Sequence, residues 1–381
     1  GDVYKRQLAD GLFAGGKAAE GLFVGYIEGE QLQGGKVQLR HYARHTLGVG
    51  QGVLDGDAHI RHTQLGDDGV VAVLHRRVDD ALALDMLYKY LDAGDIDLLG
   101  IMINKEGTYP AEYTDIMNTW YGYPQIPIGI LHNGADCEND ATNYAKAVCL
   151  IQDENSKPAF KRSLKGGYDQ LPEAPALYRK LLAQQPDSSV TIISVGFSTN
   201  LARLLDTPAD EYSSLTGKEL VAKKVKLLCT MAGCFNNPEL YEYNVVKDIP
   251  AAKKVFTEWP TTLVTSPFEV GIAINYPATS IENDFQWAPI HPMVEAYKSY
   301  QKMPYDRPTW DLTSVLYSVE GPSYFTVSPA GKINVTDKGA TEFTPDATGN
   351  RYYLTVDAAQ AENIKQHFVK LISRQPAHFT K

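Results

Sequence analysis

The stretch "VVAVLHRRVDDALALDMLYKYLDAG", residues 70–94, predicts the fold class of this chain. An apolar run suited to a buried strand is followed by two adjacent carboxylates, Asp79 and Asp80, and then by apolar residues at helical spacing. A strand that leads directly into a helix is typical of α/β proteins, whose sites lie beyond the carboxyl ends of the strands. His75 and the two arginines after it, however, make the approach to these carboxylates basic.

Strand and helix patterns alternate along the rest of the chain. This alternation predicts an α/β fold with an open, mainly parallel, Rossmann-like sheet covered by helices on both faces. A small β-meander over residues 323–345 and an amphipathic helix over residues 357–373 are expected near the C-terminus. The expected strands cover residues 96–103, 126–131, 190–196, 225–233 and 260–266, and helices are expected over residues 111–122 and 174–185 and after Asn200 and Asp311.

Charge and composition exclude several classes of partner. The net charge of −10 argues against general nucleic-acid binding, because no basic stripe is available to neutralise phosphates. No apolar run approaches the ~18–20 residues that span a bilayer, so we expect a soluble protein without a membrane partner. The compartment and the oligomeric state stay open, and a homo-oligomer is compatible with the sequence. The four cysteines have no metal-type spacing and are interpreted as small buried hydrophobic residues.

The composition changes sharply near residue 78. Residues 1–78 contain no Pro, Ser, Asn, Trp, Met or Cys, yet they hold 15 of the 31 glycines and 5 of the 9 histidines. We therefore expect residues 1–69 to be a poorly structured or foreign segment and residues 70–381 to form the functional domain; the alternative is a genuine glycine-rich N-terminal region. The opening letters "GDVYKRQ" resemble a translated sequencing adapter. The strings "GLFAGGKA" (11–18) and "HIRH" (59–62) are interpreted as accidental matches to phosphate and metal motifs.

Polar residues follow three of the expected strands, and another begins a late helix. Each has a structural interpretation, because Asp, Ser and Thr also cap helices and acidic residues favour the first helical turn. Glu242 and Asn244 lie two residues apart, which would direct both side chains the same way from an extended loop. Together these residues would bring carboxylate and carbonyl oxygens to one edge of the sheet, and such donors suit Ca²⁺. The candidates are Asp79, Asp80, Ser198, Thr199, Asn236, Glu242, Asn244 and Asp311.

From Asp79 to about residue 320, the sequence resembles the inosine/uridine-preferring nucleoside hydrolase family. The resemblance rests on the order of "VDDALAL", "VGFSTNLA", "TMAGCF…EYN" and "TWDLTSVLY". It implies a Ca²⁺-dependent hydrolase of nucleoside salvage that cleaves the N-glycosidic bond of a ribonucleoside. It further implies Asp80, Asp311 and the carbonyl group of Thr199 as metal ligands. The remaining matches, Asp79, Asn236, Glu242 and Asn244, would bind the ribose hydroxyl groups.

Two departures from the family pattern put catalysis in doubt. The D-x-D half of the opening signature falls on Val73 and His75, so the general base is missing and His75 stands at its position. A neutral imidazole is also a poor Ca²⁺ ligand. Trp310 stands where many relatives carry the histidine that helps the base to leave, and an indole is not a proton-donating acid. We therefore expect impaired hydrolysis in this chain.

Two alternatives to an active hydrolase follow from the same residues. The first is a non-catalytic protein that binds nucleosides or sugars on the same fold, which His75 and Trp310 favour. The second is a Cys/His hydrolase that uses Cys234 as its nucleophile, although no histidine lies near Cys234 in the sequence.

Overall fold

The computed structural model describes residues 69–74, 78–134 and 143–376. Within them, one 10-stranded sheet has the order β11-β10-β12-β6-β5-β4-β1-β2-β3, with β9 paired to β12. The seven strands from β12 to β3 run parallel, which confirms the predicted α/β class. The strands are β1 (Gly69–Leu74), β2 (Asp97–Ile103), β3 (Ile128–Gly129), β4 (Val190–Ser194), β5 (Val225–Met231), β6 (Thr262–Ser266), β9 (Thr326–Val327), β10 (Gly331–Val335), β11 (Thr341–Pro345) and β12 (Arg351–Thr355).

Strand β1, from the quoted stretch, lies inside the sheet between β2 and β4. Gly69 is aligned with Asp97 of β2 and with Val190 of β4, and the parallel pairing continues along the strand. Val71 is fully buried, as expected for a strand that is covered on both faces. This central strand leads into helix α2 (Val78–Ala93), so the start of α2 lies at the carboxyl edge of the sheet.

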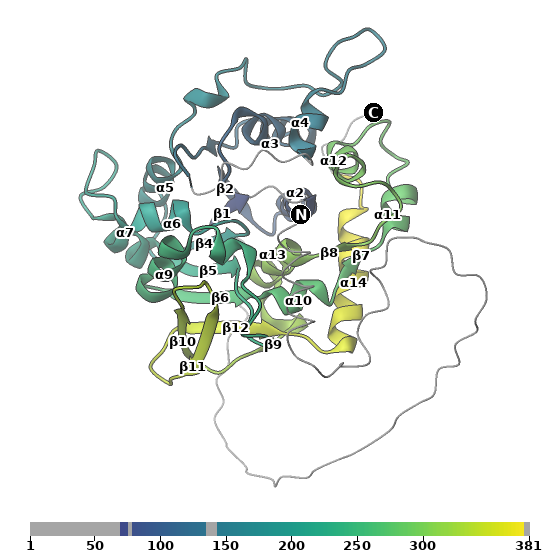
Figure 1. Ribbon diagram of the computed structural model, residues 1–381. Coiled ribbons are helices and arrows are strands. Elements are labelled where there is room, and N and C mark those ends of the chain that lie inside the picture. The colour runs from purple at the N-terminus through teal and green to yellow at the C-terminus, as the bar shows by residue number, and fades with distance from the viewer. Residues whose placement is uncertain (1–68, 75–77, 135–142, 377–381) are drawn as a thin grey trace, which may run out of the picture. The chain divides into compact units, whose positions relative to one another are not determined.

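Helices cover both faces of the sheet (Figure 1). Helices α5, α6, α7 and α9 pack with one face of the strands into a continuous apolar core, and α2 and α13 belong to the other side. Local sequence explains some of the boundaries: α3 ends at Gly122, which adopts a left-handed conformation with φ of 87°. The helices are α2, α3 (Thr108–Tyr121), α4 (Tyr144–Cys149), α5 (Ala174–Ala183), α6 (Thr199–Leu205), α7 (Gly217–Lys224), α8 (Tyr243–Val246), α9 (Ile249–Glu258), α10 (Phe268–Ile272), α11 (Ala278–Asn283), α12 (Pro292–Tyr300), α13 (Trp310–Glu320) and α14 (Ala358–Ile372), with short 3₁₀ turns at Tyr168–Gln170 and Gly321–Tyr324.

The expected antiparallel strands near the C-terminus are present, and they extend the main sheet. Strands β10 and β11 form the expected antiparallel hairpin, whose turn contains Gly339 with φ of 88°. The next strand, β12, then pairs in parallel with β6, which joins the hairpin to the edge of the main sheet. Strands β7 (Asn275–Tyr276) and β8 (Arg307–Pro308) form a separate antiparallel pair. None of the helices in the described part of the chain is long and apolar enough to cross a membrane.

Candidate functional site

The two aspartates of the quoted stretch are buried at the start of α2. Asp79 is 0% exposed and Asp80 is 2% exposed, and both lie in the first turn of the helix. This position agrees with the helix-dipole interpretation, because acidic side chains are favoured at a helix N-terminus. Burial of two adjacent carboxylates is costly, however, unless charge or hydrogen bonds compensate for it. The helix dipole therefore leaves this burial unexplained.

A third buried carboxylate, Asp311, joins them from the first turn of α13. Burial raises the pKa of Asp311 well above its ordinary value, and the negative charges of Asp79 and Asp80 raise it further. A hydrogen bond with Asp79 contributes in the same direction. Three of the predicted site residues therefore lie close enough to interact, although 231 positions separate Asp80 from Asp311 (311 − 80). Carboxylates in such contact share a proton or a cation.

The cation in contact with this acidic group is Arg307, on β8. Its Nη2 atom lies 2.5 Å from Oδ1 of Asp79, and its Nε atom donates a hydrogen bond of 3.1 Å to the same oxygen. The second oxygen, Oδ2 of Asp79, is buried, and apart from the contact of this carboxylate with Asp311 it has no hydrogen-bond partner among the described residues. Arg307 also stacks on two rings, with 4.9 Å to the ring centre of Tyr300 and 5.3 Å to that of Trp310.

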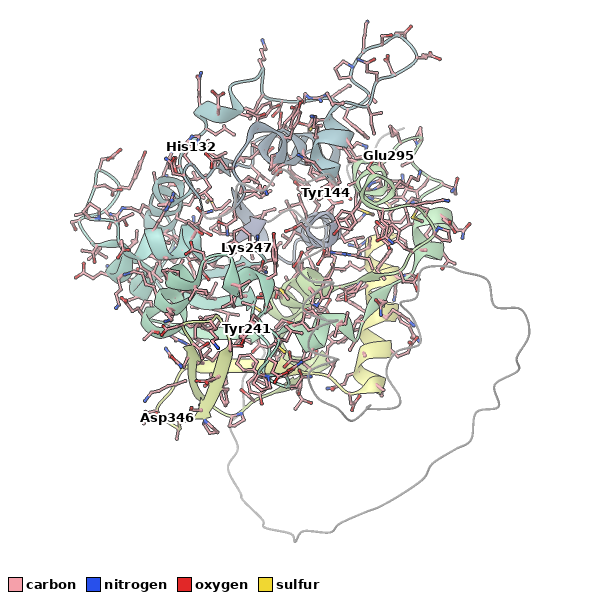
Figure 2. The ribbon with its side chains drawn as sticks, viewed as in Figure 1. His132, Tyr144, Tyr241, Lys247, Glu295 and Asp346 are labelled. Carbon is pink, nitrogen blue, oxygen red and sulfur yellow. The ribbon has the colours of Figure 1, made fainter. Side chains whose placement is uncertain are left out.

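Aromatic side chains from α3 and α4 lie beside the acidic group. Tyr144, labelled in Figure 2, is the first residue of α4 and is 4% exposed. Burial raises the pKa of Tyr144 well above its ordinary value, and so do the charge of Asp80 and the neighbouring Tyr113. The rings of Tyr113 and Tyr144 meet edge to face, with 5.3 Å between their centres. The phenol of Tyr144 thus stays protonated, as a neutral group next to the carboxylates.

Trp310, which the resemblance aligned with the family's acid, packs against α10. Its indole N–H donates a 3.0 Å hydrogen bond to the carbonyl oxygen of Phe268. Its ring packs so closely on Gly271 that a Cβ atom there would lie 2.3 Å from it. The indole hydrogen is therefore already used. His75, which the resemblance aligned with the general base, lies outside the described residues, as do the strings at 11–18 and 59–62.

The expectation of an extended loop at Glu242 and Asn244 was wrong. Residues Tyr243–Val246 form the short helix α8, and Glu242 is its N-cap residue. The Glu242 carboxylate accepts hydrogen bonds from the backbone N–H groups of Asn244, Val245 and Gly233. Asn244 donates its side-chain N–H groups to carbonyl oxygens at the ends of β4 and β5. A carboxylate that caps a helix satisfies several backbone donors at once, which explains why the loop folds up.

Asn236 and Cys234 follow β5 and differ in exposure. Asn236 is exposed, and its Oδ1 atom lies 3.4 Å from Sγ of the buried Cys234. Burial raises the pKa of Cys234 to about 12, which keeps the thiol protonated and argues against a nucleophilic role. The other described cysteines, Cys149 and Cys229, are also buried and free, as the sequence predicted.

Thr199 begins α6, after β4, and is buried. Its hydroxyl group donates a 2.6 Å hydrogen bond to Asp248. Ser198 is the N-cap residue but makes no side-chain capping bond. The loops after β2 and β4 are tied together, since the side chain of Asn200 donates to the carbonyl of Ile103 and that of Asn104 donates to the carbonyl of Phe197. These bonds fix the position of the Thr199 backbone relative to β2.

The described residues do not complete a divalent-metal site. Among them, no group of three or more His, Cys, Asp or Glu side chains is arranged to hold a metal ion. Asp80, Asp311 and the carbonyl of Thr199 are oxygen donors of the kind that Ca²⁺ prefers. One carboxylate of the acidic group, however, already pairs with Arg307. The set as described therefore does not fit Ca²⁺.

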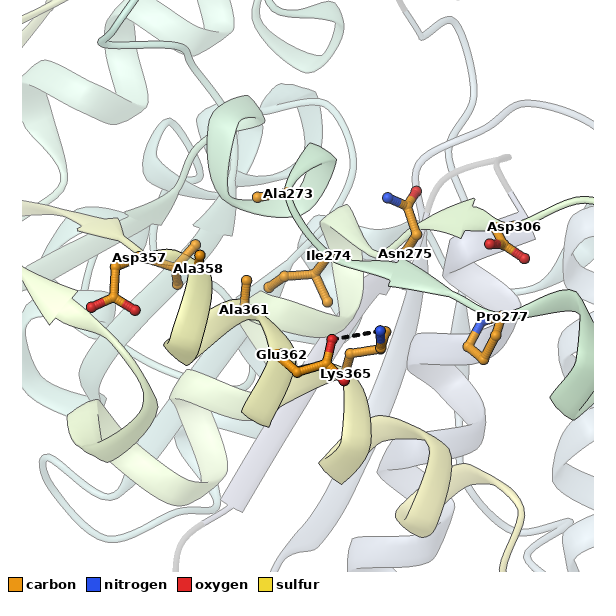
Figure 3. A pocket seen from close by; sticks show the side chains of 11 residues that line it. Ala273, Ile274, Asn275, Pro277, Asp306, Asp357, Ala358, Ala361, Glu362 and Lys365 are labelled. Carbon is orange, nitrogen blue, oxygen red and sulfur yellow. Dashed lines mark ion pairs between the residues drawn. The ribbon is translucent and has the colours of Figure 1, made fainter. Parts of the chain in front are cut away.

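A separate cavity of about 560 Å³ lies next to α14 (Figure 3). It is lined by residues around β7 and by the first turns of α14, where Glu362 pairs with Lys365 at 2.6 Å. None of the predicted site residues lines it. Its wall includes Asp306, whose carboxylate accepts a hydrogen bond from the backbone of Ala278. This cavity is thus distinct from the acidic site.

Three polar residues with notable surroundings were not selected from the sequence. Arg307 stands close to Asp311 in the sequence, but its partner Asp79 lies 228 positions away. Tyr144 belongs to a segment without a clear strand or helix pattern. Glu269 follows β6 directly, so the rule of searching post-strand loops could have found it. Burial raises its pKa, and its Oε2 atom has no hydrogen-bond partner among the described residues.

A cluster of buried acids at the carboxyl edge of a parallel sheet is typical of α/β proteins that bind small ligands at that edge. The sequence matches the family "Inosine-uridine preferring nucleoside hydrolase" over residues 76–369. The chain therefore belongs to this family. A search of curated protein sequences gave no match.

Several solved structures share this fold. A plant nucleoside hydrolase, the PpNRh1 enzyme, has 16% identity and a TM-score of 0.60, with 81% of this chain and 98% of that chain covered. A purine-preferring ribonucleoside hydrolase from Gardnerella vaginalis has 15% identity, a TM-score of 0.59 and coverages of 80% and 98%. The type III effector protein XopQ, complexed with adenosine diphosphate ribose, has 13% identity, a TM-score of 0.55 and coverages of 80% and 93%. At these identities the likeness is one of fold.

Proposed function

We propose that this chain binds a ribonucleoside at the acidic group formed by Asp79, Asp80 and Asp311, and hydrolyses its N-glycosidic bond only slowly. The carrying observation is the meeting of three buried carboxylates from two helices at the carboxyl edge of the sheet. When the bond from ribose to base breaks, the sugar becomes oxocarbenium-like. Buried carboxylates stabilise such a developing cation.

Each described residue has a definite part in this proposal. The Oδ2 atom of Asp79, which receives no hydrogen bond from Arg307, accepts one from a ribose hydroxyl group, which offsets the cost of burying that oxygen. The neutral phenol of Tyr144 donates a hydrogen bond to the sugar and shields the site from water. Asn236, Glu242 and Asn244 stay assigned to the ribose hydroxyls by resemblance, although the carboxylate of Glu242 and the amide of Asn244 already bond backbone groups.

Metal binding is the weaker part of the resemblance. The family is generally metal-dependent, and Ca²⁺ would be held here by Asp80, Asp311 and the carbonyl of Thr199. The described residues do not complete such a set, so we propose that Ca²⁺ binds weakly. A substrate among ribonucleosides, a role in nucleoside salvage and assembly as a homo-oligomer all remain parts of the proposal.

Two observations favour slow turnover and keep a non-catalytic binding protein as the second candidate. The position of the general base carries His75, and loss of a general base typically reduces rates by about 10²–10⁴-fold. The indole N–H of Trp310 is bonded to Phe268, so Trp310 does not protonate the leaving base. Under the second candidate, the site binds ribose and releases the ligand unchanged.

The test compares base release with ligand binding. We expect calorimetry to detect binding of ribose or inosine, while chromatography detects little or no free hypoxanthine from inosine in CaCl₂. Asp79→Asn and Asp80→Asn should abolish binding, and the exposed Asp337→Asn should leave it unchanged. A variant that combines Val73→Asp, His75→Asp, Arg76→Ala and Arg77→Ala should recover Ca²⁺ binding and ribose release. Rapid Ca²⁺-dependent turnover by the unmodified chain would refute the impaired-hydrolase proposal.

A further inference from the structure

The pair of Arg307 and Asp79 is unusual in its depth and geometry. Asp79 is 0% exposed and Arg307 is 8% exposed, so the ion pair is removed from solvent. Both guanidinium contacts, from Nε and Nη2, go to Oδ1 of Asp79. A bidentate pair would use both carboxylate oxygens. Here Oδ2 is buried and receives no hydrogen bond from Arg307, and apart from the contact of this carboxylate with Asp311 it has no hydrogen-bond partner among the described residues.

Arg307 is held in place by more than its charge. Its guanidinium stacks at 4.9 Å on the ring of Tyr300 and at 5.3 Å on the ring of Trp310. Its backbone is fixed by pairing with Tyr276 across the β7–β8 ribbon. An arginine fixed in this way is a permanent positive charge at the acidic group, because guanidinium does not lose its proton in proteins.

A fixed guanidinium and a divalent cation compete for the same carboxylates. Like charges a few ångströms apart repel strongly when solvent is excluded. Among the described residues, no three metal-ligating side chains are arranged to hold a metal ion, whereas the geometry of Arg307 with Asp79 is that of a strong charge-assisted hydrogen bond. The local arrangement thus fits a resident arginine better than a bound Ca²⁺ ion.

We propose that Arg307 is a positioning residue that takes the place of a divalent cation in this site. It holds Asp79 through Oδ1, so that Oδ2 is presented to a hydroxyl group of a ribosyl ligand. Ribosyl binding by this chain is then independent of Ca²⁺. This inference rests on the proposed ribonucleoside binding and adds to it a metal-free mode of recognition.

The test is calorimetric titration of ribose and inosine into the full chain, in EDTA and in CaCl₂. We expect the dissociation constants in the two buffers to agree within about threefold, a difference of less than one kcal/mol. Arg307→Met should weaken binding in EDTA by about tenfold or more, because Asp79 loses its anchor and its charge compensation. Arg307→Lys should restore part of the affinity, since it keeps the charge without the planar fork.

Arg179→Met is the matched control. Arg179 is also buried and forms a two-point pair with Asp210, at 2.6 and 2.9 Å, but none of its partners belongs to the acidic group. Arg179→Met should lose stability to a similar extent as Arg307→Met, but it should keep the parent's affinity for ribose and inosine. Thermal unfolding of each variant separates loss of folding from loss of binding.

A second readout follows the cation directly. Terbium luminescence, with displacement by Ca²⁺, should show tighter metal binding by Arg307→Met than by the parent chain, because the repelling charge is gone. Equal metal affinity of the two proteins would overturn the inference, as would an unchanged ribose affinity in Arg307→Met. Ligand binding that requires Ca²⁺ in the parent chain overturns this inference alone. Absence of ligand binding in both buffers overturns the proposed function and this inference together.

Discussion

Asp85 is a third buried acid on α2, outside the candidate site. Burial raises its pKa to about 6, against the opposing effects of Lys89 and of the hydrogen bond from Tyr121. His291 lies 3.7 Å from Asp85, and burial lowers its pKa well below the ordinary value. The Nδ1 atom of His291 accepts a hydrogen bond from the backbone of Met293, so its proton is on Nε2, which faces Asp85. Asp85 and His291 thus belong to one buried network, and their burial reduces the unfolding free energy by an amount that depends on pH.

The sign of this cost gives a prediction at the scale of one residue. The pKa of Asp85 is about 6 in the folded chain, above its ordinary 3.8. The stability that protonated Asp85 contributes is therefore fully present below pH 3.8 and is lost as the pH rises through about 6. Asp85→Asn, which does not titrate, should therefore gain up to about 3 kcal/mol in unfolding free energy relative to the parent between pH about 4 and 7.

Urea unfolding at pH about 4 and at pH about 7 measures the difference in unfolding free energy between Asp85→Asn and the parent. The opposite effect of His291, which loses stability as the pH falls, is present in both proteins and cancels to first order. Asp92→Asn is the control on the same helix, since Asp92 accepts a hydrogen bond from Tyr123 but is only half-buried. A stability difference between Asp85→Asn and the parent that does not change with pH would contradict the assignment.

At the scale of elements, the sequence predicted those strands that are formed by a continuous apolar run. The apolar runs at 96–103, 190–196, 225–233 and 260–266 became β2, β4, β5 and β6, because buried parallel strands need continuous apolar sequence. The run at 126–131 gave only the two residues of β3. The parallel pairing of β12 with β6 was not predicted, since it joins segments about 90 residues apart through register rather than composition.

The same reasoning explains the outcome at the site. Asp79, Asp80 and Asp311 could be selected because each begins a helix, a pattern visible within a few residues of sequence. Arg307 could not, because its role depends on a partner far away in the sequence and on a two-residue strand. The cap at Glu242 was also missed, since the same Glu-x-Asn spacing suits an extended loop or a helix start.

The contact of α10 with α13 gives a prediction at this scale. Gly271 on α10 lies so close to Trp310 that an added Cβ atom would lie 2.3 Å from its side chain and 2.4 Å from its Cα atom. Gly271→Ala should therefore push the start of α13 outward and reduce the unfolding free energy by about 1–3 kcal/mol. Because that turn carries Asp311, ribose affinity should fall as well.

Urea unfolding and calorimetry measure the two effects. Ala273→Ser adds one atom at the end of the same helix, where the residue lines the open cavity, and should change neither quantity. If Gly271→Ala were as stable as the parent and bound ribose equally well, the packing of α13 on α10 would not fix the position of Asp311.

At the scale of the whole molecule, the boundary of the functional domain remains a proposal. We propose that it begins near residue 70, where β1 starts, shortly before the composition changes near residue 78. Strand β1 pairs on both sides, and its Val71 is fully buried, so a domain without it would lose the centre of its sheet. The family match starts at residue 76, which is compatible with a domain boundary near residue 70.

Limited proteolysis tests this boundary. Residues 1–69 hold 15 of the 31 glycines and no proline, and glycine weakens helices and strands by roughly 0.5–1 kcal/mol per residue. We therefore predict that subtilisin removes about the first 65 residues early and leaves a stable fragment that begins near residue 70, as read by N-terminal sequencing and mass spectrometry. The fragment should unfold at the same temperature as the full chain and should keep its affinity for ribose, because every residue assigned to the site lies beyond residue 70. Equal protection of residues 1–65 and of the sheet, or loss of ribose affinity on trimming, would show that the N-terminal segment belongs to the functional domain.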